Sequence, residues 1–225
     1  MKVILTGATG YVGEGVLLEL LRTPQVEKVL SVSRRPTGVL QGKYPGLTPA
    51  ETSKLEEYIV KDMLSLEAGD KHFEGYDAVY FIAGITSVGT PEDVYDRISY
   101  DIPVHFARIM PDKDKMTFIY LSGAGTMPNG KQRWQQVKSR TERETQAMGF
   151  RHAFAYRPAI MRWAKGQQHI QAMQYPFLPF YPLLYICRRA NDMTEMAHSM
   201  LVCTRDGYHK PIIDPIDIQR LAKQL

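Results

Sequence analysis

Three glycines near the start of the chain have the spacing of a loop that holds phosphate groups. Gly7, Gly10 and Gly13 stand within the run TGATGYVG at Thr6–Gly13. The first glycine lets the chain turn sharply, the second leaves room for a phosphate against bare backbone, and the third lets a helix pack closely on a strand. The N-terminus of that helix offers N–H groups and partial positive charge to a pyrophosphate. The stretch predicts a dinucleotide site, and the alternative is a glycine-rich turn that binds nothing.

Two arginines after the second predicted strand bear on which dinucleotide is bound. In sheets of this kind an acidic residue at that place bonds the ribose hydroxyls of NAD, whereas arginine accommodates the 2′-phosphate of NADP. The chain has Ser33, Arg34 and Arg35 there and no acid. Planar guanidinium groups suit a phosphate well. We therefore expect NADP, with NAD less favoured, and the alternative is a solvated arginine pair on a loop.

The elements that position these residues alternate between strand and helix. This alternation predicts an α/β fold, a single doubly wound parallel sheet of the Rossmann type with helices on both faces. We expect one domain, in which residues 1–159 form the core and residues 160–225 form a small C-terminal segment on the substrate side. The predicted strands are Lys2–Leu5, Val26–Ser33, Glu57–Lys61, Asp77–Ala83, Met116–Ser122 and His152–Arg157, and the predicted helices begin with an apolar pattern at Val16–Leu21 and continue with Pro91–Met110, Gln132–Met148, Asn191–Cys203 and Pro215–Leu225.

Ligands of such sheets bind beyond the carboxyl ends of the strands. Small or polar residues end or follow several of the predicted strands, and we expect them near that edge. They are Thr6, Ser33, Asp62, Ala83 and Ser122.

Two further segments stand out. Arg34–Glu51 is rich in Gly, Pro and Thr and is predicted to be a long surface loop, of a length that is usually functional or mobile.

Tyr175–Ile186 is apolar and aromatic but is interrupted by three prolines, and its twelve residues are fewer than the roughly 20 of a membrane helix. It could be a wrapped core segment, the wall or lid of an apolar substrate pocket, or a dimer or membrane-surface patch.

The composition is that of an ordinary globular protein. Of 225 residues, 44% are hydrophobic and 23% charged, and the net charge of +4 is scattered, so nucleic acid is not an expected partner. Cys187 and Cys203 form no CxxC pair, and the histidines show no metal-ligand spacing. There is no signal-peptide pattern and no integral membrane segment is expected, so the sequence predicts a cytoplasmic protein.

Several motifs resemble those of the extended and atypical short-chain dehydrogenase/reductase superfamily. The resemblance covers Met1–Ala159, with a weaker similarity at Thr194–Met200, and is greatest to small NAD(P)-binding proteins described as nucleoside-sugar epimerase-like or oxidoreductase-like. The motifs follow the superfamily's order: TGATGYVG at Thr6–Gly13, SRRP at Ser33–Pro36, Asp62-Met63, Ala83-Gly84, LSGAG at Leu121–Gly125 and YRPA at Tyr156–Ala159.

The resemblance implies roles for individual residues. Asp62 would lie near the adenine, Ser122 would stand at the active site, and Tyr156–Pro158 would pass the nicotinamide side. Ser122 and Lys138 are the implied catalytic residues. The implied cofactor-binding residues are Thr6, Gly7, Thr9, Gly10, Tyr11, Val12, Gly13, Ser33, Arg34, Arg35, Asp62, Met63, Ala83, Gly84, Lys138, Tyr156 and Pro158.

One position departs from the superfamily's pattern. The superfamily uses Tyr-x-x-x-Lys on the helix after the fifth strand, where one helical turn places both side chains on one face. The lysine lowers the tyrosine pKa and holds the nicotinamide ribose, and the tyrosine acts as acid or base. Here Lys138 is present but Trp134 replaces the tyrosine. An indole cannot act as a general acid. The alternative for Lys138 is an exposed helix lysine, and for Ser122 a strand-end hydroxyl.

Three functions remain open. The first is an NADP-dependent oxidoreductase on a small carbonyl or alcohol, with the proton supplied by Ser122, water or a tyrosine such as Tyr156. The second is a non-catalytic sensor that reports the state of NADP(H) to a protein partner, which Trp134 favours. The third, sugar-nucleotide epimerisation, is weakened because it also relies on the missing tyrosine.

Overall fold

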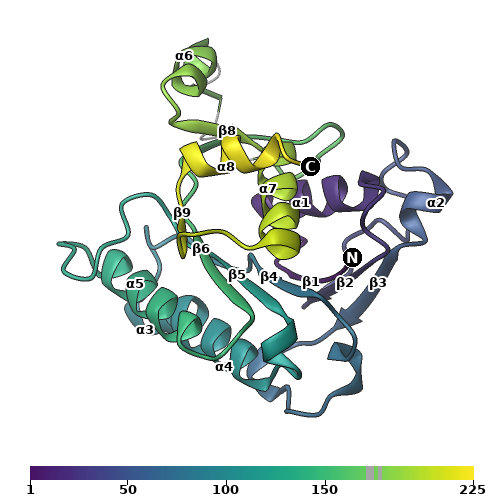
Figure 1. Cartoon of the computed structure of the whole chain (residues 1–225), viewed down its shortest axis with the longest axis horizontal. Coiled ribbons are helices and arrows are strands. Elements are labelled where there is room, and N and C mark those ends of the chain that lie inside the picture. Colours follow the sequence, from purple (N-terminus) through teal and green to yellow (C-terminus); the bar gives the residue numbers. More distant parts are fainter. Residues whose placement is uncertain (171–174, 177–178) are drawn as a thin grey trace.

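The computed structural model of the chain describes residues 1–170, 175–176 and 179–225. Within these residues the centre is a seven-stranded sheet with parallel pairing throughout, in the order β3-β2-β1-β4-β5-β6-β9 (Figure 1). The predicted α/β fold with a doubly wound parallel sheet is confirmed. The strands are β1 (Lys2–Thr6), β2 (Lys28–Ser33), β3 (Leu55–Ile59), β4 (Ala78–Phe81), β5 (Thr117–Leu121), β6 (His152–Tyr156) and β9 (Ile212–Ile213), and β7 (Ile160–Arg162) pairs separately with β8 (Ala190–Asp192).

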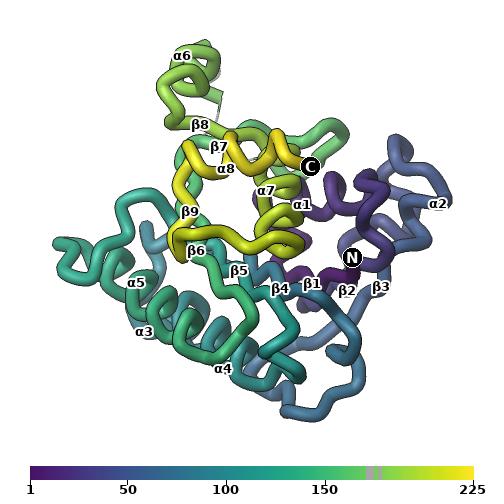
Figure 2. The backbone as a smooth tube through the Cα atoms, in the orientation of Figure 1, coloured from purple at the N-terminus to yellow at the C-terminus, as the bar shows by residue number. Residues whose placement is uncertain are grey.

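Helices cover both faces of the sheet. α1, α7 and α8 lie on one face, and α3, α4 and α5 lie on the other (Figures 1 and 2). The helices are α1 (Tyr11–Arg22), α2 (Pro49–Thr52), α3 (Glu92–Asp96), α4 (Ile102–Ile109), α5 (Arg133–Gln146), α6 (Tyr181–Ile186), α7 (Met193–Asp206) and α8 (Pro215–Ala222), with 3-10 turns η1 (Met63–Ser65), η2 (Lys71–Phe73) and η4 (Lys113–Lys115) and a π turn, η3 (Arg97–Asp101).

The central position of β1 in the sheet explains why its sequence is a continuous apolar run. Side chains of a strand alternate between the two faces of a sheet. Val3 and Leu5 join the core cluster beneath α1 and α7, whereas Ile4 joins the cluster beneath α4. Because both faces are covered, every central position of the strand is apolar.

A proline changes the hydrogen bonding of the continuous helical segment that runs from α3 through η3 to α4. Pro103 has no N–H to donate to the carbonyl of Ser99, four residues earlier, and the helix widens into the π turn η3 at this point. The carbonyl of Ser99 instead accepts hydrogen bonds from the hydroxyls of Tyr120, at 3.1 Å, and Thr141, at 2.8 Å. The carbonyl of Ser99, which Pro103 leaves without its usual helical donor, thereby links this helix to β5 and α5.

The structure differs from the sequence predictions in several elements. The first helix begins at Tyr11, immediately after the glycine loop, and not at the apolar pattern that starts at Val16. The predicted loop Arg34–Glu51 ends within the one-turn helix α2, whose N-terminus is capped by a capping box between Thr48 and Glu51. The short elements β7, β8, β9 and α6 were not predicted.

The apolar segment Tyr175–Ile186 is not a wrapped core segment. Phe177 and Leu178 lie outside the described residues. Of the described side chains only Tyr181 is buried, whereas Phe180, Leu183 and Ile186 are more than 60% exposed. Figure 1 shows α6 projecting away from the sheet and its covering helices. In the part of the chain that the structure describes, no helix has the length and apolarity needed to span a bilayer.

Candidate functional site

The turn after β1 is so tight that two of its glycines cannot be replaced without movement. Gly7 has φ +76°, and a Cβ built on it would lie 2.6 Å from the backbone nitrogen of Ala83. A Cβ on Gly13 would lie 2.0 Å from the carbonyl oxygen of Gly7. The first helical turn of α1 therefore packs directly on the loop, and this contact depends on the bare backbone of both residues.

Gly10 differs from its two neighbours in the motif. It is the N-cap of the twelve-residue helix α1, no side chain caps this helix end, and Gly10 itself is exposed. A Cβ on Gly10 would meet only the carbonyl oxygen of Gly7, at 3.5 Å. This open helix N-terminus has the shape and polarity that a pyrophosphate requires.

The side chains of other residues in the motif form contacts within the protein and hold neighbouring elements together. The Thr6 hydroxyl is fully buried and accepts hydrogen bonds from the N–H groups of Ile82 and Ala83, each at 3.1 Å. Tyr11 is also buried, and its hydroxyl donates to the carbonyl of Met161. The side chains of Thr6 and Tyr11 therefore join β1 to β4 and α1 to β7. Val12 is half-buried and packs against the core.

A cationic pocket of about 250 Å³ lies between the glycine loop and the end of β2. Arg35 and Lys43 supply its positive charge. Arg34 is exposed beside it and is not part of the lining. The lining residues are Thr9, Arg35, Pro36, Thr37, Lys43, Gln168 and His169.

Two hydrogen-bonded contacts shape the chain that carries Arg35. Ser33 is buried, and its hydroxyl donates to the carbonyl of Arg35 at 2.7 Å. The carboxylate of Glu57 accepts from both the N–H and the hydroxyl of Thr37, at 2.6 Å each. The turn after β2 is thus held in place by the neighbouring strand β3.

A buried carboxylate outside this pocket accepts hydrogen bonds from two of the residues that line it. Glu14, in the first turn of α1, is 1% exposed. It accepts hydrogen bonds from the Tyr44 hydroxyl at 2.9 Å, from the N–H groups of Gln168 and His169 at 2.6 and 2.8 Å, and from the His169 ring at 2.6 Å. Glu14 therefore holds the loop of Lys43 and the segment after β7 against α1. The sequence analysis missed Glu14, Lys43 and His169; the one signal present was a charged residue in the first turn of a largely apolar helix.

The predicted residues after β3 and β4 are divided between surface and core. The carboxylate of Asp62 caps η1 by accepting from the Leu64 N–H at 3.1 Å, and it forms an ion pair with Arg97 at 2.8 Å. Met63 is buried in the core beneath α4. Ala83 is half-buried and Gly84 is exposed at the end of β4.

Ser122 lies at the end of β5 and is 7% exposed. Its N–H donates to the carbonyl of Tyr156 at 2.8 Å. Its hydroxyl oxygen lies 3.1 Å from that of Thr126, which in turn donates to the carbonyl of Gly123 at 2.8 Å. Because the Thr126 hydrogen is used in that bond, the Ser122 hydroxyl is the donor to Thr126.

Lys138 is not the exposed helix lysine of the alternative interpretation. Its ammonium donates to the carbonyl of Leu121 at 3.1 Å and lies 5.2 Å from the centre of the Tyr120 ring. Burial lowers the pKa of Lys138 to about 8, although the charge of Glu142 acts in the opposite direction. The ammonium therefore sits beside the residue that precedes Ser122.

Trp134 occupies the position one turn before Lys138. A Cβ built on Gly125 would lie 3.6 Å from its ring, so the indole covers the loop that follows Ser122. The indole N–H donates to the side chain of Gln132. Gln135 secures the same loop by donating to the carbonyl of Gly125 at 2.7 Å.

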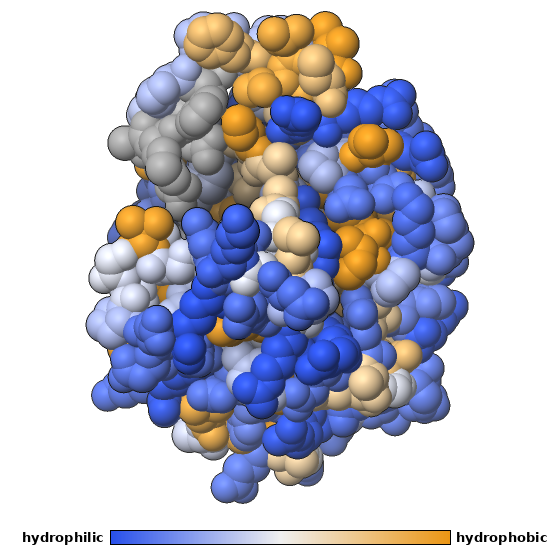
Figure 3. Space-filling view, turned by 90° about the vertical axis from the view of Figure 1, so that its left-hand side faces the viewer, coloured by the Kyte–Doolittle hydropathy of each residue, from blue (hydrophilic) through white to orange (hydrophobic). Residues whose placement is uncertain are grey.

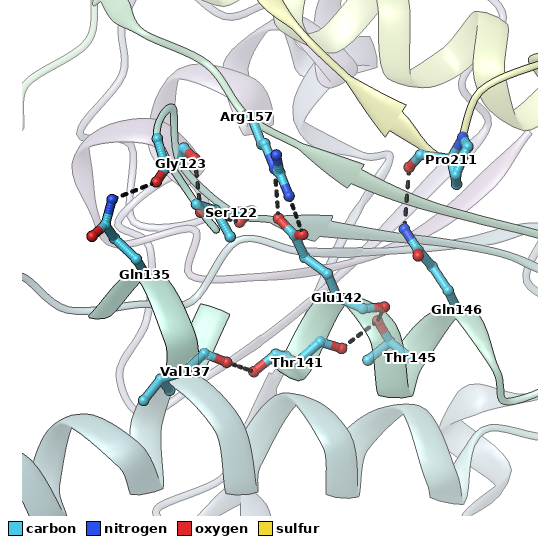
Figure 4. A network of polar contacts seen from close by, with 12 residues as sticks. Ser122, Gly123, Gln135, Val137, Thr141, Glu142, Thr145, Gln146, Arg157 and Pro211 are labelled. Atoms are coloured by element: carbon cyan, nitrogen blue, oxygen red, sulfur yellow. Dashed lines mark hydrogen bonds and ion pairs between the residues drawn. The ribbon is translucent and has the colours of Figure 1, made fainter. Parts of the chain in front are cut away.

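A buried ion pair fixes α5 against the sheet. Glu142 is 3% exposed, and both of its carboxylate oxygens accept from the guanidinium of Arg157 at the end of β6 (Figure 4). Thr141 and Gln146 add hydrogen bonds along the same helix, the latter to the carbonyl of Pro211 at 3.3 Å. This network sets the position of the helix that carries Lys138.

Tyr156 requires a correction. Its side chain is fully buried under α7, and its hydroxyl lies 3.3 Å from the Cys203 sulfur. Burial raises the pKa of the Tyr156 phenol well above its ordinary value. The expectation that this phenol supplies a proton is wrong; only the backbone carbonyl of Tyr156 contacts Ser122. Pro158 is buried, and its carbonyl accepts from the N–H of Ala124 at 3.3 Å.

Residues 3–161 match the profile of the NAD dependent epimerase/dehydratase family. "Protein fmp52-1, mitochondrial" of Aspergillus terreus is 27% identical over 163 residues, which cover 71% of this chain and 66% of that protein. The match therefore spans just under two thirds of that relative's length.

Solved structures resemble the fold at low sequence identity. MoeE5 in complex with UDP-glucuronic acid and NAD has a TM-score of 0.66 at 16% identity, covering 94% of this chain and 74% of that chain. Carbonyl reductase Sniffer of D. melanogaster has a TM-score of 0.61 at 11% identity, covering 96% of each chain. These likenesses show the Rossmann-type fold.

The predicted cytoplasmic location is overturned by the relatives. The curated relative from Aspergillus terreus is named as a mitochondrial protein, as are those from other fungi. The cytoplasmic prediction, which was based on the lack of a signal-peptide pattern, is therefore wrong.

Proposed function

The chain belongs to the NAD dependent epimerase/dehydratase family, and we propose that it binds NADP(H) and uses it to interconvert a small carbonyl compound and its alcohol. The family membership also confirms the resemblance to short-chain dehydrogenases/reductases. The single observation that carries the proposal is the cationic pocket between Thr9 and Arg35.

The pocket favours NADP over NAD because of where its charges lie. It extends from Thr9 in the glycine loop to Arg35 after β2, the position that distinguishes the two dinucleotides in such sheets. The cations of Arg35 and Lys43 line it, and its lining contains no carboxylate. The 2′-phosphate would lie between these two cations, and Gly10 and the N-terminus of α1 would hold the pyrophosphate.

The remaining part of the proposal concerns the proton. When bound, the nicotinamide supplies or accepts the hydride. Reduction of a carbonyl also consumes one proton, and the fixed direction of the Ser122 hydroxyl toward Thr126 leaves that side chain as an acceptor. The ammonium of Lys138 has a pKa of about 8, close to physiological pH. We assign the proton donor to Lys138, which becomes neutral and is protonated again from solvent.

A second candidate function is supported by Trp134. Its indole covers the loop after Ser122, at the helical position where a catalytic tyrosine would stand in the superfamily. A protein that binds NADP(H) without turnover, and passes its redox state to a protein partner, is consistent with that replacement.

The experiment combines binding with turnover. Calorimetric titration compares NADPH with NADH, and NADPH oxidation is then followed with a panel of small aldehydes and ketones. The proposal expects tighter NADPH binding and turnover with at least one class of carbonyl. Equal binding of both dinucleotides would overturn the NADP assignment. Tight NADPH binding with no oxidation across the panel would overturn the oxidoreductase and favour the sensor.

A further inference from the structure

The short helix α6 has two faces of opposite character. Leu183 and Ile186 lie on one side and are 61% and 76% exposed. Phe180, immediately before the helix, is 61% exposed, and Tyr175 is 52% exposed. We call these four residues, Tyr175, Phe180, Leu183 and Ile186, the apolar foot. Figure 3 shows a hydrophobic patch at the same end of the molecule where Figure 1 places α6.

The other face of α6 anchors it to the body of the protein. Tyr181 is buried, and the guanidinium of Arg162 lies 5.1 Å from its ring centre. The hydroxyl of Tyr185 donates to Glu195 in α7 at 2.6 Å, and its carbonyl accepts from the Gln219 side chain at 3.2 Å. The apolar foot is therefore held outward by a fixed set of contacts.

Cations follow the apolar foot directly. Arg188 and Arg189 are both exposed, and Arg188 has φ +58°, which turns the chain sharply at the end of α6. The first two acidic side chains that follow in the chain are already paired, Asp192 with Arg162 and Glu195 with Tyr185. Among the residues that the structure describes, neither Arg188 nor Arg189 forms an ion pair with a carboxylate, so the end of the molecule that carries the apolar foot has positive charge at its edge.

We propose that the apolar foot inserts into the surface of a lipid bilayer that contains anionic phospholipids, with Arg188 and Arg189 at the level of the headgroups. A protruding apolar tip bordered by arginines is the arrangement of a protein that lies on a membrane surface without spanning it. Aromatic rings are favoured in the interfacial region, and Trp163 packs 5.8 Å from the Tyr175 ring at the base of the foot.

The shape favours a bilayer over a second copy of the chain. A stable protein interface needs about 20–30 residues on each side, whereas α6 presents a narrow projection of six residues with a few neighbours. A fluid bilayer can surround such a projection, and anionic headgroups complement the arginines. This inference stands apart from the proposed function, because the apolar foot does not line the cationic pocket.

The test is sedimentation of the full chain with vesicles of phosphatidylcholine alone or of phosphatidylcholine with phosphatidylglycerol. We expect partitioning to the anionic vesicles that falls at high salt. Leu183→Ser/Ile186→Ser should lower it at least tenfold, and Arg188→Gln/Arg189→Gln should abolish the preference for anionic vesicles. Val88→Ser is the matched control, because Val88 is 84% exposed and follows β4 in the chain, outside the apolar foot.

Three outcomes would overturn the inference. They are no binding of the parent to either vesicle, equal binding of the Leu183→Ser/Ile186→Ser variant and the parent, and a dimer in lipid-free solution that this variant converts to monomer. Melting temperature and NADPH affinity of every variant are measured alongside. Unchanged values show that a loss of vesicle binding comes from the surface and not from unfolding.

Discussion

The imidazole of His169 lies 2.6 Å from a carboxylate oxygen of Glu14, although the two residues are 155 positions apart in the chain. One stands in the first turn of the helix behind the glycine loop, and the other lines the cationic pocket. Their contact joins the two parts of the proposed cofactor site.

Glu14→Gln should destabilise the protein and weaken NADPH binding together. The carboxylate accepts hydrogen bonds from four donor groups, and an amide would direct its own N–H groups at some of them. Hydrogen bonds to a buried charged group contribute about 1.5–3 kcal/mol each, so a loss of about 2–4 kcal/mol in unfolding free energy is expected. Chemical denaturation measures it. Glu19→Gln on the same helix is the control, since its partner Arg22 is partly exposed; equal effects would contradict a special role of Glu14.

Arg35→Ala and Lys43→Ala should each weaken NADPH binding and leave NADH binding nearly unchanged. Each removes one charge-assisted contact to the 2′-phosphate, worth about 1.5–3 kcal/mol, or roughly ten- to a hundred-fold in affinity. Calorimetry with both dinucleotides makes the comparison. Arg34→Ala should have a smaller effect, because Arg34 does not line the pocket. A loss with Arg34→Ala that exceeds the other two would show that the phosphate lies elsewhere.

Substitutions of Gly10 and Gly13 should have different effects, the first on NADPH binding and the second on the stability of the fold. Gly10→Val places a side chain in the open space at the start of α1, where only one atom lies within 4 Å of the Cβ; NADPH binding should be lost while the melting temperature without cofactor changes little. Gly13→Ala places its Cβ 2.0 Å from the Gly7 carbonyl and should lower that melting temperature strongly. Thermal unfolding and titration of both variants give the result, and normal binding by Gly10→Val would remove the pyrophosphate from this position.

Carbonyl reduction should decline above pH 8. Burial lowers the pKa of Lys138 to about 8, so the ammonium that donates the proton is present below that pH and is lost above it. The rate of a step that needs this acid falls about tenfold per pH unit beyond the pKa. A pH profile of kcat for NADPH oxidation tests this. Lys138→Met should abolish the alkaline limb together with most activity, and Lys131→Met, at an exposed position, should do neither.

Trp134→Tyr should raise carbonyl reduction. Tyr and Lys138 would then share one helix face, and the phenol would add a second positioned acid beside the ammonium; such an acid contributes about 10²–10⁴ in rate. The comparison is NADPH oxidation by the parent, Trp134→Tyr and Trp134→Phe, where the phenylalanine lacks the acid but opens similar space. Brisk parent activity that collapses in both variants would mean that the indole itself shapes a working site and would exclude the sensor.

The fold and the phosphate loop were predictable because their signals are local. An apolar run, a glycine spacing and a helix that follows are all contained within about twenty residues, and β1 with α1 shows each of them. The short β9 was missed because two residues carry no periodic pattern. Its place in the sheet comes from pairing with β6.

The side chains of the site were harder to predict than its backbone. Tyr156 ends a strand at the correct edge, yet side chains alternate along a strand, and its parity matches that of the buried Phe154. Lys43 and His169 come from two irregular segments far apart in sequence, and neither has a local signal. The fixed direction of the Ser122 hydroxyl depends on Thr126, a contact that only the folded loop creates.

The contact between Glu14 and His169 also has a consequence for the order of events during synthesis. The carboxylate leaves the ribosome early, but its partners Gln168 and His169 follow more than 150 positions later, beyond the residues that match the family profile. Burying the charge before they arrive would cost several kcal/mol, so we expect the first turn of α1 to stay hydrated in the nascent chain. Closure of this long loop is slow compared with local folding. The proposed dinucleotide site is thus expected to be completed late, with the segment after β7, and not with the glycine loop that is translated first.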